Sequence, residues 1–262
     1  MKRLLKLGIL FLILVPVILS GCEDEDSDVN TELTYYEIFE IINDNAKATK
    51  NNYLVNAEII TTIYRSDESN PSEILSISYT NKYDGTNLYI YEQTISASKD
   101  ENGKDVTSTM LVENTYYNNK RYVNYVSNIG DQFEAEETVV ENQEVPLNNL
   151  VQLELPLTEN LFLNATYSNE NGKNVIIIPA STKVCAIITS TMLPSLKLGI
   201  NENATSYEGS LQYIYDDSYN FIGLILNTHI HLNDDSHLAY DYSFKLELKQ
   251  FGNVLVEDPE TK

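Results

Sequence analysis

The sequence predicts an α+β fold in which a curved antiparallel β-sheet, a half-barrel, is partly wrapped around two or three helices. Three observations predict this class. An early segment has apolar residues at helical spacing, many later segments alternate apolar and polar residues, and short turn pairs join those segments. Because parallel strands need crossovers of about a dozen residues or more, such short joins favour antiparallel pairing.

The first element is expected to be a helix over residues 34–50. Thr34 and Glu37 have the spacing of a capping box, in which each side chain accepts a hydrogen bond from the other residue's backbone N–H. Ile38 and Ile42 then recur at helical spacing. One face of this helix should therefore pack on a core.

From Tyr53 onward the apolar period changes to two, which is typical of half-buried strands. The later segments are rich in Tyr, Ile, Val and Thr, residue types that suit a pleated surface. Four pairs that tolerate positive φ, as tight hairpins require, separate them: Asp84-Gly85, Asn102-Gly103, Asn118-Asn119 and Asn171-Gly172.

The middle of the chain interrupts this pattern. Residues 144–165 combine two prolines with many leucines and are expected to form short helical turns and loops. A second helix is predicted over residues 181–193, where Val184 and Ile188 have helical spacing and Pro194 ends the pattern. Cys185 lies inside this apolar segment, so we expect a small buried side chain rather than a reactive thiol.

The last part of the domain has the clearest β pattern, a meander of three long strands with a continuous apolar face from Ile222 to Leu248. The last two strands share that face only if Ile230 pairs with Tyr240, because a one-residue slip would turn one strand's apolar side to water. That register gathers three histidines and one aspartate on the polar face: His229, His231, His237 and Asp241.

The N-terminus has the layout of an export signal, with a basic start, an apolar run over residues 7–19 and small residues before Cys22. The run is shorter than the roughly 20 residues that span a membrane. The four residues that end at Cys22 resemble the lipobox of bacterial lipoproteins. That resemblance implies removal of residues 1–21, lipid attachment at Cys22 and a position on the extracytoplasmic face of the cell membrane.

Composition divides the rest of the chain and limits its partners. Residues 22–30 should be a lipidated, acidic tether, residues 31–255 a single domain and residues 256–262 a disordered tail. The chain has 17 basic and 39 acidic residues, and residues 1–21 hold three of the basic ones, so the processed chain would carry a charge of −25. Such a surface repels nucleic acid, which we exclude as a partner, and anionic lipid headgroups.

The order of these elements resembles the LolA–LppX superfamily of exported proteins and lipoproteins. The segments 212–217 and 220–223 are similar to a strand–turn–strand of that group, and the likeness covers most of residues 31–251. The resemblance implies a concave sheet face that holds a lipid or acyl chain. The abundance of Asn, Ile and Tyr, with no Trp, points to an AT-rich genome, and we expect a Gram-positive source.

A geometric argument indicates that the first helix alone cannot cover the apolar face of the sheet. A helix of about 17 residues is roughly 25 Å long and about 10 Å wide, so it cannot cover seven or more strands spaced about 4.8 Å apart. The segment 144–194, sheet curvature or a ligand must shield the remaining apolar face. The predicted ligand cavity is lined by Ile59, Leu224, Leu226 and Leu246.

The predicted function is therefore non-enzymatic binding of a lipid-like or other hydrophobic molecule. The sequence contains no nucleophile elbow, Walker A loop, dinucleotide-binding fingerprint or His-Glu-x-x-His motif. No residue receives a catalytic or metal-binding role, and no cofactor is expected. Two alternatives stay open. One is a protein-interaction module that uses a Tyr-rich sheet face, and the other is weak metal binding by His229, His231 and His237.

Overall fold

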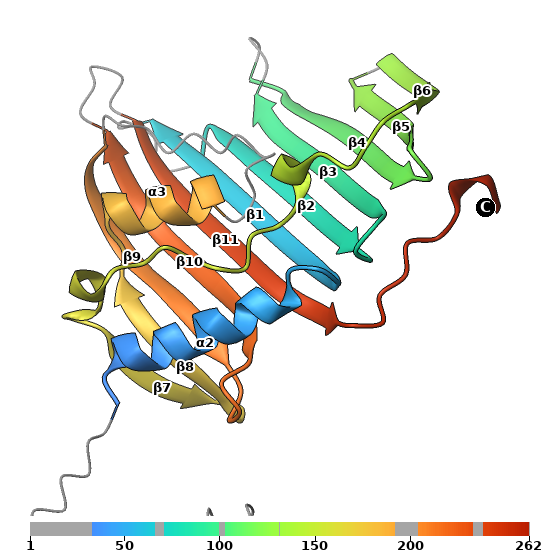
Figure 1. The fold of residues 1–262 in the computed structure, drawn as a ribbon. Coiled ribbons are helices and arrows are strands. Elements are labelled where there is room, and N and C mark those ends of the chain that lie inside the picture. Colours follow the sequence, from blue (N-terminus) through green and yellow to red (C-terminus); the bar gives the residue numbers. More distant parts are fainter. Residues whose placement is uncertain are drawn as a thin grey trace, which may run out of the picture. The chain divides into compact units, whose positions relative to one another are not determined.

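The computed structural model describes residues 33–65, 71–99, 103–130, 132–191, 204–232 and 238–261. Cys22, the tether and His237 lie outside these residues. Residues Thr34–Lys262 form one compact unit, built on a single antiparallel sheet of 11 strands (Figure 1). No helix in the described ranges is long and apolar enough to cross a membrane.

The strands in chain order are β1 (Tyr53–Arg65), β2 (Glu73–Tyr83), β3 (Leu88–Lys99), β4 (Asp105–Tyr117), β5 (Lys120–Ile129), β6 (Gln132–Glu141), β7 (Thr166–Glu170), β8 (Lys173–Pro179), β9 (Ala204–Tyr215), β10 (Phe221–Leu232) and β11 (Leu238–Phe251). Their order across the sheet is β6-β5-β4-β3-β2-β1-β11-β10-β9-β8-β7. The first and last strands therefore pair at the centre, and two meanders run outward from them to open edges at β6 and β7.

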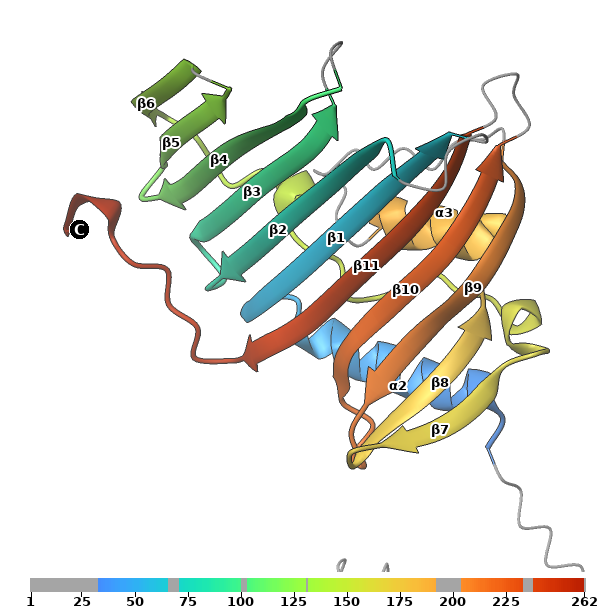
Figure 2. The same cartoon turned by 180° about the vertical axis from the view of Figure 1, so that it is seen from behind.

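Two α-helices lie on one face of this sheet, α2 (Tyr35–Thr49) against β10 and α3 (Thr182–Thr191) against β9 (Figure 1). The opposite face carries neither of them (Figure 2). Both helices were expected from the sequence, and the capping box is confirmed: the Thr34 N–H donates to Glu37 Oε2 at 2.7 Å, and the Glu37 N–H donates to Thr34 Oγ1 at 3.2 Å.

The predicted fold class is confirmed in its coarser form, an antiparallel sheet with a few helices. In the structure, the sheet wraps around the helices much less than the sequence predicted. The sheet is open, and β3–β6 extend beyond both α-helices (Figure 1). Three short 3₁₀ helices complete the described elements: η1 (Leu147–Asn149), η2 (Glu159–Phe162) and η3 (Pro259–Thr261).

A crossing segment, residues 151–157, runs between α2 and α3 over the strands (Figure 1). Its odd-numbered residues are buried and alternate with exposed ones: Val151, Leu153, Leu155 and Leu157. The short helical turns and loops predicted over residues 144–165 are confirmed, but one part of that region behaves as an extended chain with an apolar side. It covers sheet surface that one helix could not.

The meander of β9, β10 and β11 has the predicted register, with Ile230 opposite Tyr240 and His229 opposite Asp241. The prediction that Ile222 begins the buried apolar face was wrong. A register shift between Phe221 and Gly223 in the pairing with β9 puts Phe221 in the core and leaves Ile222 only half-buried. A bulge adds one residue to a strand and so reverses the alternation beyond it.

The chain after β11 differs from the disordered tail expected over residues 256–262. Val254 and Val256 are buried, and the Val256 N–H donates to Asp84 Oδ2 at 3.2 Å. Farther along, Tyr122 Oη donates to Glu260 Oε1 at 2.7 Å. Asp84 and side chains of β5 bind this segment through specific hydrogen bonds, for which the sequence pattern gave no signal.

Asp84 also organises the turn between β2 and β3, so its replacement should loosen two elements together. Its carboxylate accepts hydrogen bonds from Thr86, Asn87 and Val256. Burial alone would raise the pKa of Asp84, but these hydrogen bonds outweigh it and hold the pKa below its ordinary value. We expect Asp84→Ala to lower the free energy of unfolding by about 1–3 kcal/mol at pH 7, measured by chemical denaturation.

The pH dependence of this loss follows from the lowered pKa. The stabilisation is present above the unfolded-state value of about 3.9 and disappears as the pH falls through the lower folded-state pKa. Wild type and Asp84→Ala should therefore converge in acid. Asp216 is the matched control. Its carboxylate accepts hydrogen bonds from Ser218 and Asn220 in a similar turn, but among the described residues no hydrogen bond joins it to residues 254–261. Faster hydrogen exchange over residues 254–261 in Asp216→Ala than in Asp84→Ala would contradict this account.

Candidate functional site

The four residues predicted to line a ligand cavity lie together, but in a filled core. Ile59, Leu224, Leu226 and Leu246 are 1%, 0%, 0% and 1% exposed. Leu224 pairs with Leu246, and both Ile59 and Leu226 pair with Phe244. None of them lines the pocket beside α2 or either of two pockets on the other parts of the described sheet. The expected cavity is thus not open at these residues.

Aromatic side chains from α2, η2 and the sheet occupy part of the space beneath the helix. The Phe39 ring lies 5.0 Å from the Phe162 ring and 5.2 Å from the Tyr213 ring, measured between centroids. Tyr213 in turn lies 5.1 Å from Phe221. With the leucines of the crossing segment, this aromatic stack packs on the sheet. Residues of the segment 144–165 therefore cover this part of the sheet, as one of the three alternatives from the sequence required.

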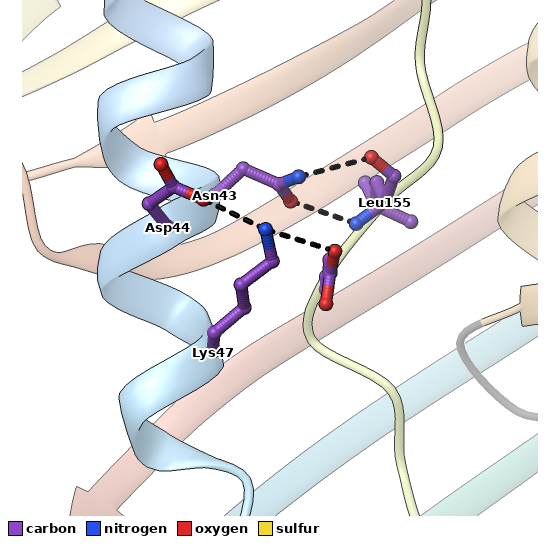
Figure 3. A network of polar contacts seen from close by, with 5 residues as sticks. Asn43, Asp44, Lys47 and Leu155 are labelled. Atoms are coloured by element: carbon purple, nitrogen blue, oxygen red, sulfur yellow. Dashed lines mark hydrogen bonds and ion pairs between the residues drawn. The ribbon is translucent and has the colours of Figure 1, made fainter.

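The crossing segment also holds α2 in place through polar contacts (Figure 3). Asn43 Nδ2 donates to the Leu155 carbonyl at 3.2 Å, and the Leu155 N–H donates back to Asn43 Oδ1 at 2.7 Å. Lys47 Nζ lies 2.7 Å from Asp44 Oδ1 and 3.2 Å from Glu154 Oε1. The Asn43 amide thus satisfies the N–H and C=O groups of Leu155, which lies outside the sheet. These two hydrogen bonds anchor α2 on this side.

A groove opens beside α2, next to the ends of β10 and β11, and we call it the α2 groove. Its volume is about 590 Å³. Its lining is Asp44, Asn45, Ala46, Ala48, Asn220, Phe221, Leu248, Lys249, Gln250 and Phe251. The end of the aromatic stack, Phe221, is thus one wall of this groove.

The chemistry of the α2 groove favours an uncharged molecule with an apolar part. Phe221, Leu248 and Phe251 offer apolar surface, and Phe251 is 55% exposed. The two charged residues of the lining already form ion pairs: Asp44 with Lys47 at 2.7 Å, and Lys249 with Glu247 at 2.6 Å. The amides of the lining can donate or accept hydrogen bonds. The groove therefore suits burial of an apolar group beside a few neutral polar contacts.

Sequence reasoning missed this groove because its lining comes from three places in the chain. For two of these places, the outer side of α2 and the end of β11, the alternation of polar and apolar residues predicts ordinary exposed surface. The exposed Phe251 at a strand end was the one available signal. A single exposed apolar side chain is ordinary on a protein surface, so this signal did not identify a groove by itself.

His229 and His231 lie on the sheet face opposite the helices. His229 Nδ1 is 2.5 Å from Asp241 Oδ1, and the His229 and His231 rings are 4.5 Å apart between centroids. Burial alone would raise the pKa of Asp241, but hydrogen bonds from His229 and Tyr64 outweigh burial and hold the pKa below its ordinary value. Within the described ranges, no three His, Cys, Asp or Glu side chains are grouped so that they could hold a metal ion.

Cys185 is buried on α3, as predicted, and burial raises the pKa of its thiol to about 11. The tyrosines also have structural roles. Tyr53 and Tyr213 are fully buried, while Tyr89 on the uncovered face donates to Glu113 at 2.8 Å. Several tyrosines of the predicted Tyr-rich face are therefore bound within the sheet, which weakens the case for a flat tyrosine patch.

The fold and the groove together define a class, an open antiparallel sheet with two helices on one face and a ligand-sized groove beside one of them. No protein-family model and no curated protein matches the chain. Matched solved structures include the Aeromonas veronii immune modulator A, with a TM-score of 0.23 and 8% identity, over 77% of this chain and 98% of that one.

Two further matched structures are a DUF1329 family protein from Desulfovibrio piger and a LolA superfamily protein from Nitrosomonas europaea. The first has a TM-score of 0.19 and 7% identity, over 82% of this chain and 92% of that one. The second has a TM-score of 0.20 and 8% identity, over 85% and 96%. These TM-scores are too low to carry an argument about fold or function. The resemblance to the LolA–LppX superfamily therefore stays a prediction.

Proposed function

We propose that the protein is a lipid-anchored lipoprotein of the extracytoplasmic membrane face that binds a lipid-like or other hydrophobic molecule in the α2 groove without catalysing a reaction. The α2 groove carries this proposal. Its volume of about 590 Å³ lies inside the roughly 300–1,000 Å³ typical of small-molecule sites, and its walls combine apolar side chains with a few polar groups. The bound molecule would lie in the open groove beside α2, outside the filled core.

The binding half of the proposal is tested with N-phenyl-1-naphthylamine, an uncharged apolar fluorophore. Ala48→Trp places a large side chain in the groove, whereas Ile41→Trp changes an exposed residue of the same helix that does not line it. We expect Ala48→Trp to weaken fluorophore binding by about tenfold or more, which is ~1.4 kcal/mol. Ile41→Trp should bind like the wild type, in a fluorescence titration.

Two results would contradict a site in the groove. One is equal affinity of both tryptophan variants, and the other is a wild-type protein that does not bind the fluorophore. Mass spectrometry of lipids extracted from the natively purified protein then identifies the natural occupant. Circular dichroism of each variant shows whether it is folded, so that loss of binding is not confused with loss of structure.

The anchoring half of the proposal rests on Cys22 and its lipobox resemblance. We expect Cys22→Ala to remain an uncut precursor or to leave the membrane fraction, because the cysteine sulfur is the point of lipid attachment. Cell fractionation combined with mass spectrometry of the N-terminus measures both outcomes. A Cys22→Ala protein that is cut normally and stays on the membrane would contradict lipid anchoring.

A further inference from the structure

The α2 groove contains four side-chain hydrogen-bond donors, and each of them already binds an oxygen of the protein. They are the amide groups of Asn45, Asn220 and Gln250 and the ammonium group of Lys249. Asn45 Nδ2 donates to the Tyr219 carbonyl at 2.9 Å, and Asn220 Nδ2 donates to Asp216 Oδ2 at 3.0 Å. These bonds fix the orientation of both amides, because only the NH2 group of an amide can bind a carbonyl or carboxylate oxygen.

The donors on the β11 side of the groove are engaged in the same way. Gln250 Nε2 lies 3.3 Å from the carbonyl oxygens of Gly252 and Asn253, and Lys249 Nζ lies 2.6 Å from Glu247 Oε2. In contrast, no protein group in the described ranges donates to any of the three amide oxygens of the lining. The free polar atoms that the amides present to a bound molecule are therefore acceptors.

The turn that carries Asn220 is strained. Six non-glycine residues of the described ranges have a positive φ; five are asparagines, which tolerate it, and the sixth is Tyr219, with a φ of +59°. The Asn45 hydrogen bond and the stacking of Tyr219 on Tyr215, at 6.0 Å between ring centroids, hold it there. Strained residues of this kind cluster at ligand sites, where the surrounding structure fixes them. This one joins the two amides, because Asn45 binds its carbonyl and Asn220 follows it.

The size of the groove limits the apolar part of a ligand to one chain. A methylene group is about as large as a water molecule, which takes up about 30 Å³ in the liquid. The groove volume of about 590 Å³ therefore holds about 20 such groups. That is enough for one long hydrocarbon chain with a small head group, and too little for two such chains.

The charges around the groove disfavour an anionic head group. A carboxylate or phosphate would have to compete with Glu247 for Lys249, in a chain whose net charge is −22. Asp44, the other charged residue of the lining, is an acceptor that already binds Lys47. A neutral hydroxyl needs no such exchange, because it can donate to an amide oxygen that is free.

We propose that the α2 groove binds a neutral amphiphile with one hydrocarbon chain and a hydroxyl head group, such as a long-chain alcohol. The inference rests on the proposed function and names the chemical class of its ligand. The hydroxyl donates to the amide oxygen of Asn45, which the strained turn holds beside Asn220. The chain lies along the apolar walls of the groove, Phe221, Leu248 and Phe251.

The test compares 1-dodecanol with dodecyl methyl ether as competitors of N-phenyl-1-naphthylamine. Both have the same chain, but only the alcohol donates a hydrogen bond, and burial alone would favour the more apolar ether. We expect the alcohol to bind the wild type about fivefold more tightly than the ether, the effect of one hydrogen bond. Dodecanoate, an anion, and 1,2-didodecanoylglycerol, which has two chains, should each displace the fluorophore more weakly than the alcohol.

Asn45→Leu tests the acceptor itself. We expect this variant to bind the ether about as tightly as the wild type does and to lose the preference for the alcohol. The matched control is Asn124→Leu on β5, whose amide also donates one hydrogen bond, to Glu113 at 3.1 Å, but does not line the groove. It should keep the wild-type preference. If Asn45→Leu bound neither ligand, the wild-type comparison of alcohol with ether would decide.

Three results would overturn this ligand class while the proposed function stands, since the groove would still bind a hydrophobic molecule. They are equal affinity of the wild type for alcohol and ether, an unchanged preference in Asn45→Leu, and tighter binding of dodecanoate or of the two-chain lipid than of the alcohol. A wild-type protein that binds none of these molecules, the fluorophore included, would overturn both proposals.

Discussion

Gly209→Ala is expected to destabilise the domain by more than about 4 kcal/mol, an exceptional cost for one methyl group. A Cβ at Gly209 would lie 2.1 Å from the Asn227 carbonyl oxygen and 3.0 Å from Thr228 Cα, both backbone atoms of β10. The φ of Gly209 is +130°, which non-glycine residues rarely adopt. The added methyl group must therefore separate β9 from β10 as well as strain the backbone.

Urea unfolding followed by circular dichroism measures this effect, and Gly172→Ala separates its two causes. Gly172 also has a positive φ, of +75°, but a Cβ there would meet nothing within 4 Å. It should cost only about 1–2 kcal/mol, the penalty of a left-handed conformation. If Gly209→Ala proved no more destabilising than Gly172→Ala, the close contact between β9 and β10 would be refuted.

Phe39→Ala is expected to cost about 3–5 kcal/mol, the usual range for removing a buried aromatic side chain. Phe39 is 1% exposed and contacts the rings of Tyr36, Phe162 and Tyr213, so its loss leaves a cavity at the centre of the aromatic stack. The sheet and the crossing segment are fixed on both sides of this space and should collapse into it only in part.

The control for Phe39→Ala is Ile41→Ala on the exposed side of the same helix, which should change stability by less than about 1 kcal/mol. Denaturant midpoints compare the two variants. Because the stack ends at Phe221 in the groove wall, Phe39→Ala should also alter N-phenyl-1-naphthylamine binding. A cost no larger than that of Ile41→Ala would mean that α2 is not packed as described.

Local signals predicted most of the elements correctly. The capping box of Thr34 and Glu37 begins α2, and Asn118, Asn119 and Gly172 have the positive φ that their turns require. The register of β10 and β11 was also predictable, since a one-residue slip would expose an apolar face. All these features depend on residues within a few positions of each other or on two strands joined by one turn.

The pairing of β1 with β11 had no such signal. Tyr53 pairs with Phe251, almost 200 positions along the chain. Many alternating strands of similar composition offer comparable pairing surfaces, so no local pattern selects this one. The same holds for Asn43 and Leu155, whose reciprocal hydrogen bonds fix α2 against the crossing segment and whose residues show no motif in the sequence.

The sequence by itself determined the α+β class, the antiparallel hairpins, both helices and the burial of Cys185, because these follow from periodicity, turn chemistry and capping. Tertiary structure alone decided which part of the space beside the sheet is filled and which part is open. Leucines of the crossing segment and Phe39 belong to the same buried core as Leu224 and Leu226, and the open volume lies instead beside α2. Alternation records which side chains are buried, but not which distant segment buries them.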